Sequence, residues 1–510
     1  MPKRNRRLPL LAALLLIPLA SPSPAESPRP NVVFILADDL GWRDLGCYGS
    51  TFYQTPHIDA LARRGLRFTQ AYAASPLCSP TRASILTGLY PARTGITYPE
   101  CHLPKEVLEK RRQTQAAPRE RWLLAESVTR LKTDYFTLAE AFQQAGYATG
   151  HFGKWHLGPE PYSPLQHGFD VDIPHTPAPG PLLHGFFHPF PVWKDHGKPG
   201  DNLEDLVADE AVKYIEQNKD RPFFLNYWAF EVHSPWQAKP EQIARYQAQA
   251  RPADLQRNPV YAGMVETLDD AVGRLIAALQ RAEILDRTII VFASDNGPFA
   301  FAHPAPVMPP AYTKIPATSV LPLRGGKASV YEGGIRVPLI VVWPGVTPAG
   351  RVTDALALST DFLPTLVDLL RLPVPAGVTF DGVSLRAVLE NGSPVRNEVF
   401  CHFPHHQDTR PYEQMAAPRS AAPASSLRKG DWKLIRFFAD HDDGTDRYEL
   451  YNLKEDAGET ADLAAENPEL VRELNAILEA RLEDTGAVLP QRNPAFRAAI
   501  STKEKKRAVQ

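Results

Sequence analysis

Residues 76–88 read PLCSPTRASILTG and predict a short helix with a well-defined start and end. Ser79 is a favourable N-cap, and a proline at the next position needs no amide partner there. We therefore expect the helix to begin immediately after Cys78 and to end at the glycine that closes the stretch. Cys78 then lies at the positive end of the helix, and Arg82, one turn further on, adds a permanent cation. The stretch predicts a place that holds a sulfate or phosphate group.

Polar side chains follow several apolar runs elsewhere in the chain. Residues 31–37 read NVVFILA, which is typical of a strand buried on both faces, and two carboxylates follow it directly. Further buried strands are expected at 147–152, 222–230 and 288–293. The polar residues that follow these four runs are Asp38 and Asp39, Lys154 and His156, His233, and Asp295 and Asn296.

The expected strands alternate with amphipathic helices, such as the one whose apolar face recurs over residues 268–279. This alternation predicts an α/β fold with a large, mostly parallel sheet flanked by helices. Ligands bind such sheets beyond the carboxyl ends of the strands. We therefore expect the polar residues that follow the strands to converge at one edge of the sheet.

Each of these motifs, taken alone, also fits a simpler interpretation. The two aspartates fit a solvated turn, and the Asp-Asn-Gly run at 295–297 fits a common turn. Lys154 and Lys327 fit solvated lysines in loops. His156 and His233 fit hydrogen-bonded structural histidines. Polar groups of complementary types after four separate strands are much less expected by chance, so the sequence favours one shared site.

At 510 residues and 44% hydrophobic content, the chain is long enough for one large domain and a smaller one. We expect the large domain at 26–372, a small α+β subdomain of antiparallel sheet plus helix at 373–500, and a basic tail at 501–510. The 56 basic and 58 acidic residues nearly cancel, so no nucleic-acid partner is expected. The cysteines lack a CxxC spacing, so neither a zinc knuckle nor a disulfide scaffold is indicated, and their pairing stays open; they are Cys47, Cys78, Cys101 and Cys401.

Smaller segments surround the large domain. Residues 97–130 are polar and without a period, and we expect a surface insertion that shapes the rim of the site. In the subdomain, paired strands are expected at 426–438 and 447–453, and an amphipathic helix at 468–484.

The N-terminus has the three regions of a secretory signal peptide. Basic residues come first, an apolar run at 8–20 follows, and small residues lead to Glu26, which places the signal peptide at residues 1–25. The apolar run is too short to span a bilayer, and no later stretch is long enough. We expect an exported protein, periplasmic or secreted, without a membrane span.

The pentapeptide at 78–82 fits the Cys-x-Pro-x-Arg signature of the sulfatase family, and Leu86, Thr87 and Gly88 continue it as that family does. Together with the strand-end motifs, the chain resembles a type I sulfatase of the alkaline phosphatase superfamily, with its catalytic domain at 26–372. The resemblance implies that formylglycine-generating machinery oxidises Cys78 during maturation, and that the hydrated aldehyde is the nucleophile.

The resemblance also implies roles for the other residues. One calcium ion is expected, and oxygen ligands agree with this hard cation and disfavour zinc. Its implied ligands are Asp38, Asp39, Asp295, Asn296 and the modified Cys78. Arg82 and the metal make the attacking hydroxyl acidic, and Lys154 and Lys327 neutralise the sulfate oxygens. His233 protonates the departing alcohol, and His156 takes the proton of the second hydroxyl.

The implied substrate is a sulfated sugar. Residues 401–406 read CHFPHH and, with Arg410, offer polar contacts to a sugar, although a metal-free surface loop fits them equally well. Two other functions stay open: a phosphate or phosphonate ester hydrolase of the same superfamily, and a glycan-binding protein whose Cys78 is unconverted.

Overall fold

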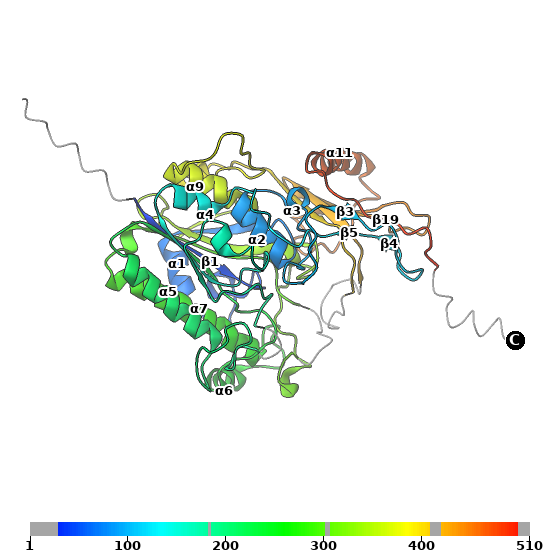
Figure 1. Cartoon of the computed structure of the whole chain (residues 1–510). Coiled ribbons are helices and arrows are strands. Elements are labelled where there is room, and N and C mark those ends of the chain that lie inside the picture. The colour runs from blue at the N-terminus through cyan, green and yellow to red at the C-terminus, as the bar shows by residue number, and fades with distance from the viewer. Residues whose placement is uncertain (1–28, 182–184, 301–306, 409–419, 498–510) are drawn as a thin grey trace, which may run out of the picture.

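The fold is given by a computed structural model that describes residues 29–181, 185–300, 307–408 and 420–497 (Figure 1). Three predictions fall outside the described residues: the signal peptide at 1–25, the basic tail at 501–510 and the contact from Arg410.

The largest element of the described chain is a nine-stranded sheet. In spatial order its strands are β11 (Arg351–Thr353), β2 (Leu66–Tyr72), β10 (Arg336–Val342), β9 (Thr288–Ser294), β1 (Asn31–Ala37), β8 (Phe223–Trp228), β6 (Ala148–Gly153) and β7 (Val171–Ile173), with β12 (Ala357–Leu358) also paired to β2. Within this sheet β10 is antiparallel to both neighbours, and every other pair is parallel. The predicted large, mostly parallel sheet is confirmed.

Side chains of the central strand β1 alternate between two hydrophobic cores. Val33 and Ile35 belong to one core, and Val32 and Phe34 belong to the other. A strand covered on both faces has no solvated side, which explains why the run is apolar at every position. Helices lie on both faces of the sheet (Figure 1). The first core includes α1 (Pro56–Arg64), α5 (Leu203–Asn218), α6 (Pro240–Gln249) and α7 (Pro259–Arg281), and the second includes α2 (Cys78–Thr87), α4 (Leu138–Gln144), α9 (Phe362–Leu370) and α10 (Arg386–Asn391).

A separate antiparallel sheet lies near the C-terminus, as predicted. It consists of β13 (Glu398–Phe403), β16 (Ala424–Lys429), β17 (Trp432–Phe437) and β18 (Arg447–Asn452), and α11 (Pro468–Asp484) shares its core. The single strand expected at 426–438 is wrong, because Gly430, at a positive φ of 57°, turns the chain between β16 and β17. Lys433 joins this sheet to α8 (Glu332–Ile335) through a buried ion pair with Glu332 (3.0 Å), and it also pairs with the buried Glu459 of a later loop (2.8 Å).

The segment at 97–130 is more than the surface insertion that the sequence predicts. It contains β3 (Arg111–Arg112), β4 (Trp122–Leu123) and β5 (Ala125–Glu126), and β4 pairs with β19 (Gln491–Arg492). Trp122 Nε1 also donates to the carbonyl of Phe438 (2.7 Å). Arg130 is buried, and its guanidinium donates to backbone carbonyls of the same segment. These carbonyls therefore have hydrogen-bond partners although they lie away from water. The segment therefore contacts two cores: Cys101 and Val128 belong to the second core of the large sheet, and Trp122 packs against the core of the C-terminal sheet. Its neighbour α3 (Pro91–Thr94) shares the core of the second sheet.

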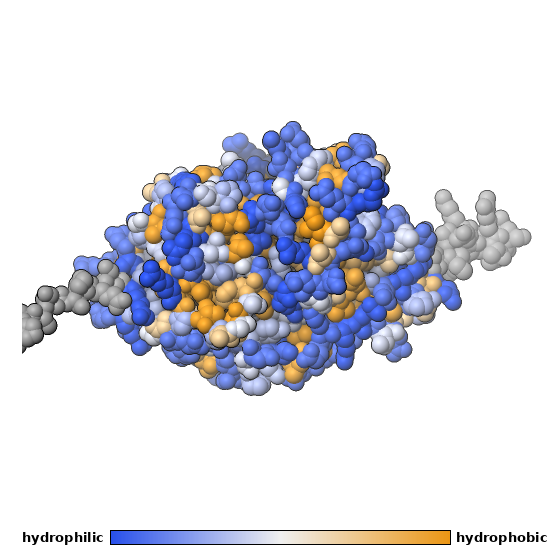
Figure 2. Space-filling model, turned by 90° about the horizontal axis from the view of Figure 1, so that it is seen from above, coloured by the Kyte–Doolittle hydropathy of each residue, from blue (hydrophilic) through white to orange (hydrophobic). Residues whose placement is uncertain are grey.

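The face in Figure 2 carries small hydrophobic groups among mostly hydrophilic side chains. The exposed large hydrophobic residues of the described chain are Leu165, Leu255, Val352 and Val383. Within the described ranges, every helix is too short or too polar to cross a bilayer.

Candidate active site

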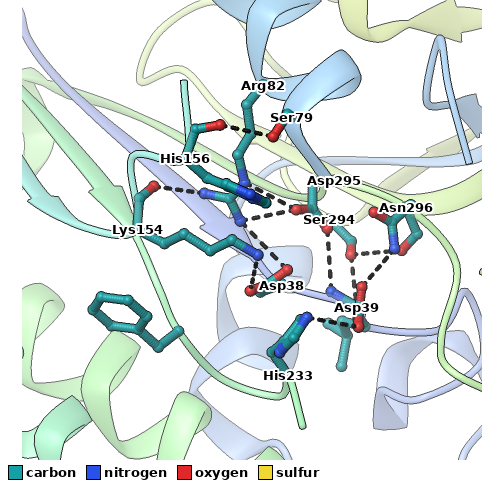
Figure 3. Close-up of polar contacts among 12 residues, drawn as sticks. Asp38, Asp39, Ser79, Arg82, Lys154, His156, His233, Ser294, Asp295 and Asn296 are labelled. Carbon is teal, nitrogen blue, oxygen red and sulfur yellow. Dashed lines mark hydrogen bonds and ion pairs between the residues drawn. The ribbon is translucent and has the colours of Figure 1, made fainter. Parts of the chain in front are cut away.

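An acidic group forms because β1 and β9 are parallel neighbours whose last residues lie opposite each other. Asp38 and Asp39 therefore leave the sheet beside Asp295 and Asn296 (Figure 3). The backbone N–H of Asp39 donates to Asp295 Oδ1 (3.1 Å), and Asn296 Nδ2 donates to Asp39 Oδ1 (2.7 Å). All four side chains are buried. The structure brings these two predicted motifs together at one edge of the sheet.

The helix α2 places Cys78 at its first residue, fully buried. The predicted cap is wrong: Leu77 is the N-cap, and the Ser79 hydroxyl donates instead to the carbonyl of His156 (2.7 Å). The hydroxyl thus ties the helix to the loop after β6 rather than to its own first amides. The predicted end of the helix is confirmed, because Gly88 caps it with φ at 68°.

Arg82 lies one turn into α2 and is fully buried. It donates to Asp295 Oδ2 through Nε (3.0 Å) and Nη2 (2.8 Å), and to the carbonyl of Lys154 through Nη1 (2.7 Å). Its guanidinium also lies over the Trp228 ring, 5.2 Å from the centroid. A buried arginine needs this many partners, because an unpaired buried charge is costly.

Two lysines complete the basic side of the group. Lys154 Nζ lies 2.6 Å from Asp38 Oδ2, and Lys327 Nζ lies 2.6 Å from Asp39 Oδ2. Lys154 reaches this position because a glycine precedes it: Gly153 has φ at 108°, and a Cβ there would lie 1.9 Å from the carbonyl oxygen of β8 at Trp228.

The two predicted histidines lie in the loops that follow β6 and β8. His156 is 1% exposed, and its Nε2 lies 3.0 Å from Nδ1 of His102, a residue that the sequence did not single out. His233 is partly exposed, and its Nε2 lies 3.7 Å from Asp39 Oδ2. Its Nδ1 lies 2.6 Å from the carbonyl of Ser234. A carbonyl can only accept, so Nδ1 carries a proton and Nε2 faces the acidic group.

Burial and charge act in opposite directions on the groups of this site. Burial raises the pKa of the Cys78 thiol, but Lys154 and Lys327 outweigh burial and lower it to about 7. Burial likewise raises the pKa of Asp39, but Lys327 and other cations bring it to about 2. Asp295 shows the opposite balance, since burial and the neighbouring Asp38 raise its pKa to about 6. The site therefore favours negative charge at residues 39 and 78.

The carboxylate and amide oxygens of the site fit a hard divalent cation, whereas the thiol and the imidazole beside them suit softer metals. Ligand atoms of Asp38, Asp39, Cys78 and His233 all lie within 4.8 Å of one another. Asp38 Oδ1 and Asn296 Oδ1 are buried acceptors without a hydrogen-bond partner among the described residues, which suits oxygens that bind a metal. Asp295 differs, because its Oδ1 accepts from Asp39 and its Oδ2 accepts from Arg82.

The histidines at 401–406 divide into two kinds. His402 and His405 are buried and bonded inside the protein, to Ser425 Oγ (2.7 Å) and to Thr97 Oγ1 (2.8 Å). A surface loop is therefore the wrong description of these two residues. His406 is half-buried and its ring lies tilted against that of Trp122, with centroids 5.0 Å apart and an interplanar angle of 33°.

A family model described as Sulfatase matches residues 30–372. The chain belongs to the sulfatase family. A second family model, described as N-sulphoglucosamine sulphohydrolase, C-terminal, matches residues 326–487 of this sulfatase.

This sulfatase is similar to named relatives along most of its length. It is 32% identical to N-acetylgalactosamine-6-sulfatase of Rattus norvegicus, over 77% of this chain and 71% of the relative. It is 27% identical to N-acetylgalactosamine-6-O-sulfatase of Bacteroides thetaiotaomicron, over 93% of this chain and 98% of that relative. The solved structure of Ps i-CgsB in complex with k-i-k-neocarrahexaose matches with a TM-score of 0.70 and 25% identity, over 94% of this chain and 96% of that one. The sulfatase is a sulfuric ester hydrolase with the type I fold that its sequence motifs predict.

Proposed function

We propose that this sulfatase removes sulfate from sulfated carbohydrates, with residue 78 oxidised to formylglycine as the nucleophile and one calcium ion bound beside it. The observation that carries the proposal is the position of Cys78, whose buried sulfur lies within 4.8 Å of carboxylate ligand atoms. Two lysines lower the pKa of its thiol. A metal site and a sulfate-binding site thus share one centre. The names of the rat and Bacteroides relatives, both N-acetylgalactosamine sulfatases, support a sulfated sugar as the substrate.

The ligands proposed for calcium are those implied by the sequence: Asp38, Asp39, Asp295, Asn296 and residue 78. Formylglycine supplies a hydrated aldehyde with one hydroxyl to attack sulfur and a second to release the sulfate, and calcium supplies the charge that makes the first hydroxyl acidic. The residue needs formylglycine-generating machinery during maturation. The signal sequence at 1–25 supports export to the periplasm or the exterior.

The remaining residues bind the sulfate and move protons. Lys154 and Lys327 contact the sulfate oxygens as negative charge builds on those oxygens. Arg82 holds Asp295 and the backbone of Lys154 in place beside them. His233 donates a proton from Nε2 to the leaving oxygen, a role typically worth ~10²–10⁴ in rate. His156 accepts a proton from the second hydroxyl of residue 78. The proposed acid and base therefore lie on different elements, after β8 and after β6.

Turnover of 4-nitrophenyl sulfate and 4-nitrophenyl phosphate, measured side by side, tests the proposed function. We expect the sulfate ester to be the better substrate, because the described residues show one acidic metal cluster and a doubly charged phosphate calls for more positive charge. The Cys78 peptide is expected to be about 18 Da lighter than its thiol form after conversion to the aldehyde. Phosphate hydrolysed orders of magnitude faster would favour the phosphoesterase, and free thiol alone in protein from its native host would favour the binding protein.

Removal of divalent cations is expected to lower kcat/KM by about a hundredfold, because the metal no longer stabilises the charge at residue 78. The measurement is turnover after dialysis against EDTA, followed by addition of Ca²⁺ or Zn²⁺. Calcium is expected to restore turnover and zinc is not, since the ligands are mostly oxygen atoms. Full activity in protein whose metal content has fallen to zero by elemental analysis would contradict the calcium site.

A further inference from the structure

His102 and His156 form an imidazole pair that leads from the buried site towards its rim. His102 Nδ1 lies 3.0 Å from His156 Nε2, and the two ring centroids are 5.1 Å apart. His156 is 1% exposed, whereas His102 is only half-buried. The pair therefore joins a ring sealed inside the protein to a ring in reach of solvent.

His156 has two ring nitrogens, and each has a distinct environment. Its Nδ1 is buried and has no hydrogen-bond partner in the described part of the chain. Its Nε2 faces His102. A proton that binds at Nδ1 leaves the ring neutral if the proton on Nε2 passes to His102.

The backbone on both sides of His102 is fixed. The carbonyls of Cys101 and Leu103 both accept from the buried guanidinium of Arg130, through Nη1 (3.2 Å) and Nη2 (2.8 Å). The N–H of Leu103 donates to the carbonyl of Glu100 (3.0 Å). The position of the His102 ring is thus set by its own segment, and the contact with His156 does not depend on a free loop.

The chemistry of the pair follows from its surroundings. Burial is the main cause that lowers the pKa of both rings, and Lys154 lowers both further. Two neutral imidazoles at this separation share one proton, because one nitrogen must donate and the other must accept. The charged or titratable groups that face the two rings are Lys154, Arg82, His233 and Arg130. The backbone carbonyl of Pro99 also accepts a hydrogen bond from the ring of His102, so the proton that leaves this ring passes to water in competition with that carbonyl.

We propose that His102 is the proton outlet of this active site. A proton from residue 78 binds Nδ1 of His156, the proton on Nε2 of His156 passes to Nδ1 of His102, and the proton on Nε2 of His102 passes to water. One proton enters and one leaves, and both rings end neutral with their proton on Nδ1. Both rings must return to the Nε2–H tautomer before the next turnover, a step that changes neither their charge nor their number of protons. The inference rests on the proposed function, in which His156 is the base, and it explains why a segment outside the large sheet contacts that base.

The test compares His102→Ala and His102→Asn with the wild type on 4-nitrophenyl sulfate, in protein of equal formylglycine content by mass. Asparagine can still hydrogen-bond to His156 but cannot pass a proton. We expect kcat to fall about 10- to 100-fold in both variants with KM within about threefold, and added imidazole to raise kcat of His102→Ala by at least about fivefold.

The matched control is His175→Ala, which removes a half-exposed histidine paired with Asp172, and it is expected to keep wild-type kcat. Wild-type kcat in His102→Asn would overturn the inference, because the hydrogen bond alone would then suffice. Wild-type kcat in His102→Ala, or no imidazole rescue, would also overturn it. A wild-type enzyme that turns over no sulfate ester would instead overturn the proposed function, and the inference with it.

Discussion

Replacement of Cys78 by serine is expected to lower steady-state turnover of sulfate esters by at least ~10⁴. A serine hydroxyl can attack the sulfate at the same position, but it has no second hydroxyl from which the sulfate can be released. The enzyme is then expected to stop after one turnover with a sulfated serine. The measurements are the amplitude of product release in the first turnover and the mass of the residue-78 peptide, which gains one SO₃ group.

The control for this variant is Cys47→Ser. Cys47 is half-buried, and burial is the main reason that the pKa of its thiol lies well above the ordinary value. A thiol of this kind is inert, so turnover is expected to stay at the wild-type level. Sustained turnover by Cys78→Ser, at a tenth of wild type or more, would contradict the role proposed for residue 78.

Replacement of Arg82 by alanine is expected to lower the free energy of unfolding by about 3–5 kcal/mol, because it leaves buried carboxylates without their cation. Asp295 loses two donors, and Asp38 loses a cation whose Nη2 lies 3.6 Å from its Oδ1. Sulfate turnover is expected to fall with it, since Arg82 also holds the carbonyl of Lys154. Urea denaturation monitored by fluorescence, together with turnover of 4-nitrophenyl sulfate, measures both effects.

Two matched variants separate charge from geometry. Arg82→Lys keeps the charge but loses the forked donors, so an intermediate loss of stability is expected. Arg64→Ala breaks an ion pair with Asp286 whose side chains are 42% and 91% exposed, and a change below about 1 kcal/mol is expected. Equal stability of Arg82→Ala and Arg64→Ala would show that the buried pairing contributes little.

The elements that the sequence predicted well are those determined by local pattern. The strand at 31–37 is apolar at every position because both its faces are covered, and the structure has β1 over those residues. The stretch at 76–88 predicts a helix that ends at its last glycine, and Gly88 caps α2 with φ at 68°. These signals lie within a few residues of one another, so no tertiary partner changes them.

The errors arise where a residue far away in the sequence determines the hydrogen bond that a side chain makes. Ser79 has the right residue type for an N-cap, but its hydroxyl donates to the carbonyl of His156, which lies 77 positions further along the chain. His102 lies in a segment without period, and its contact with His156 spans 54 positions. His402 and His405 look like a polar surface cluster, yet Ser425 and Thr97 satisfy them inside the protein. No local pattern marks His102, because its contact with His156 depends on how residues 97–130 fold against the loop after β6.

The pairing of β4 with β19 links the segment that carries His102 to the end of the second sheet. Trp122 adds a bond from this segment to the carbonyl of Phe438. A chimaera that exchanges only the C-terminal sheet with a homologue would therefore place a different backbone against the segment that contacts His156. Recombination aimed at a new sugar preference should transfer residues 97–130 and the C-terminal sheet as one unit, even though about three hundred positions separate them in the gene.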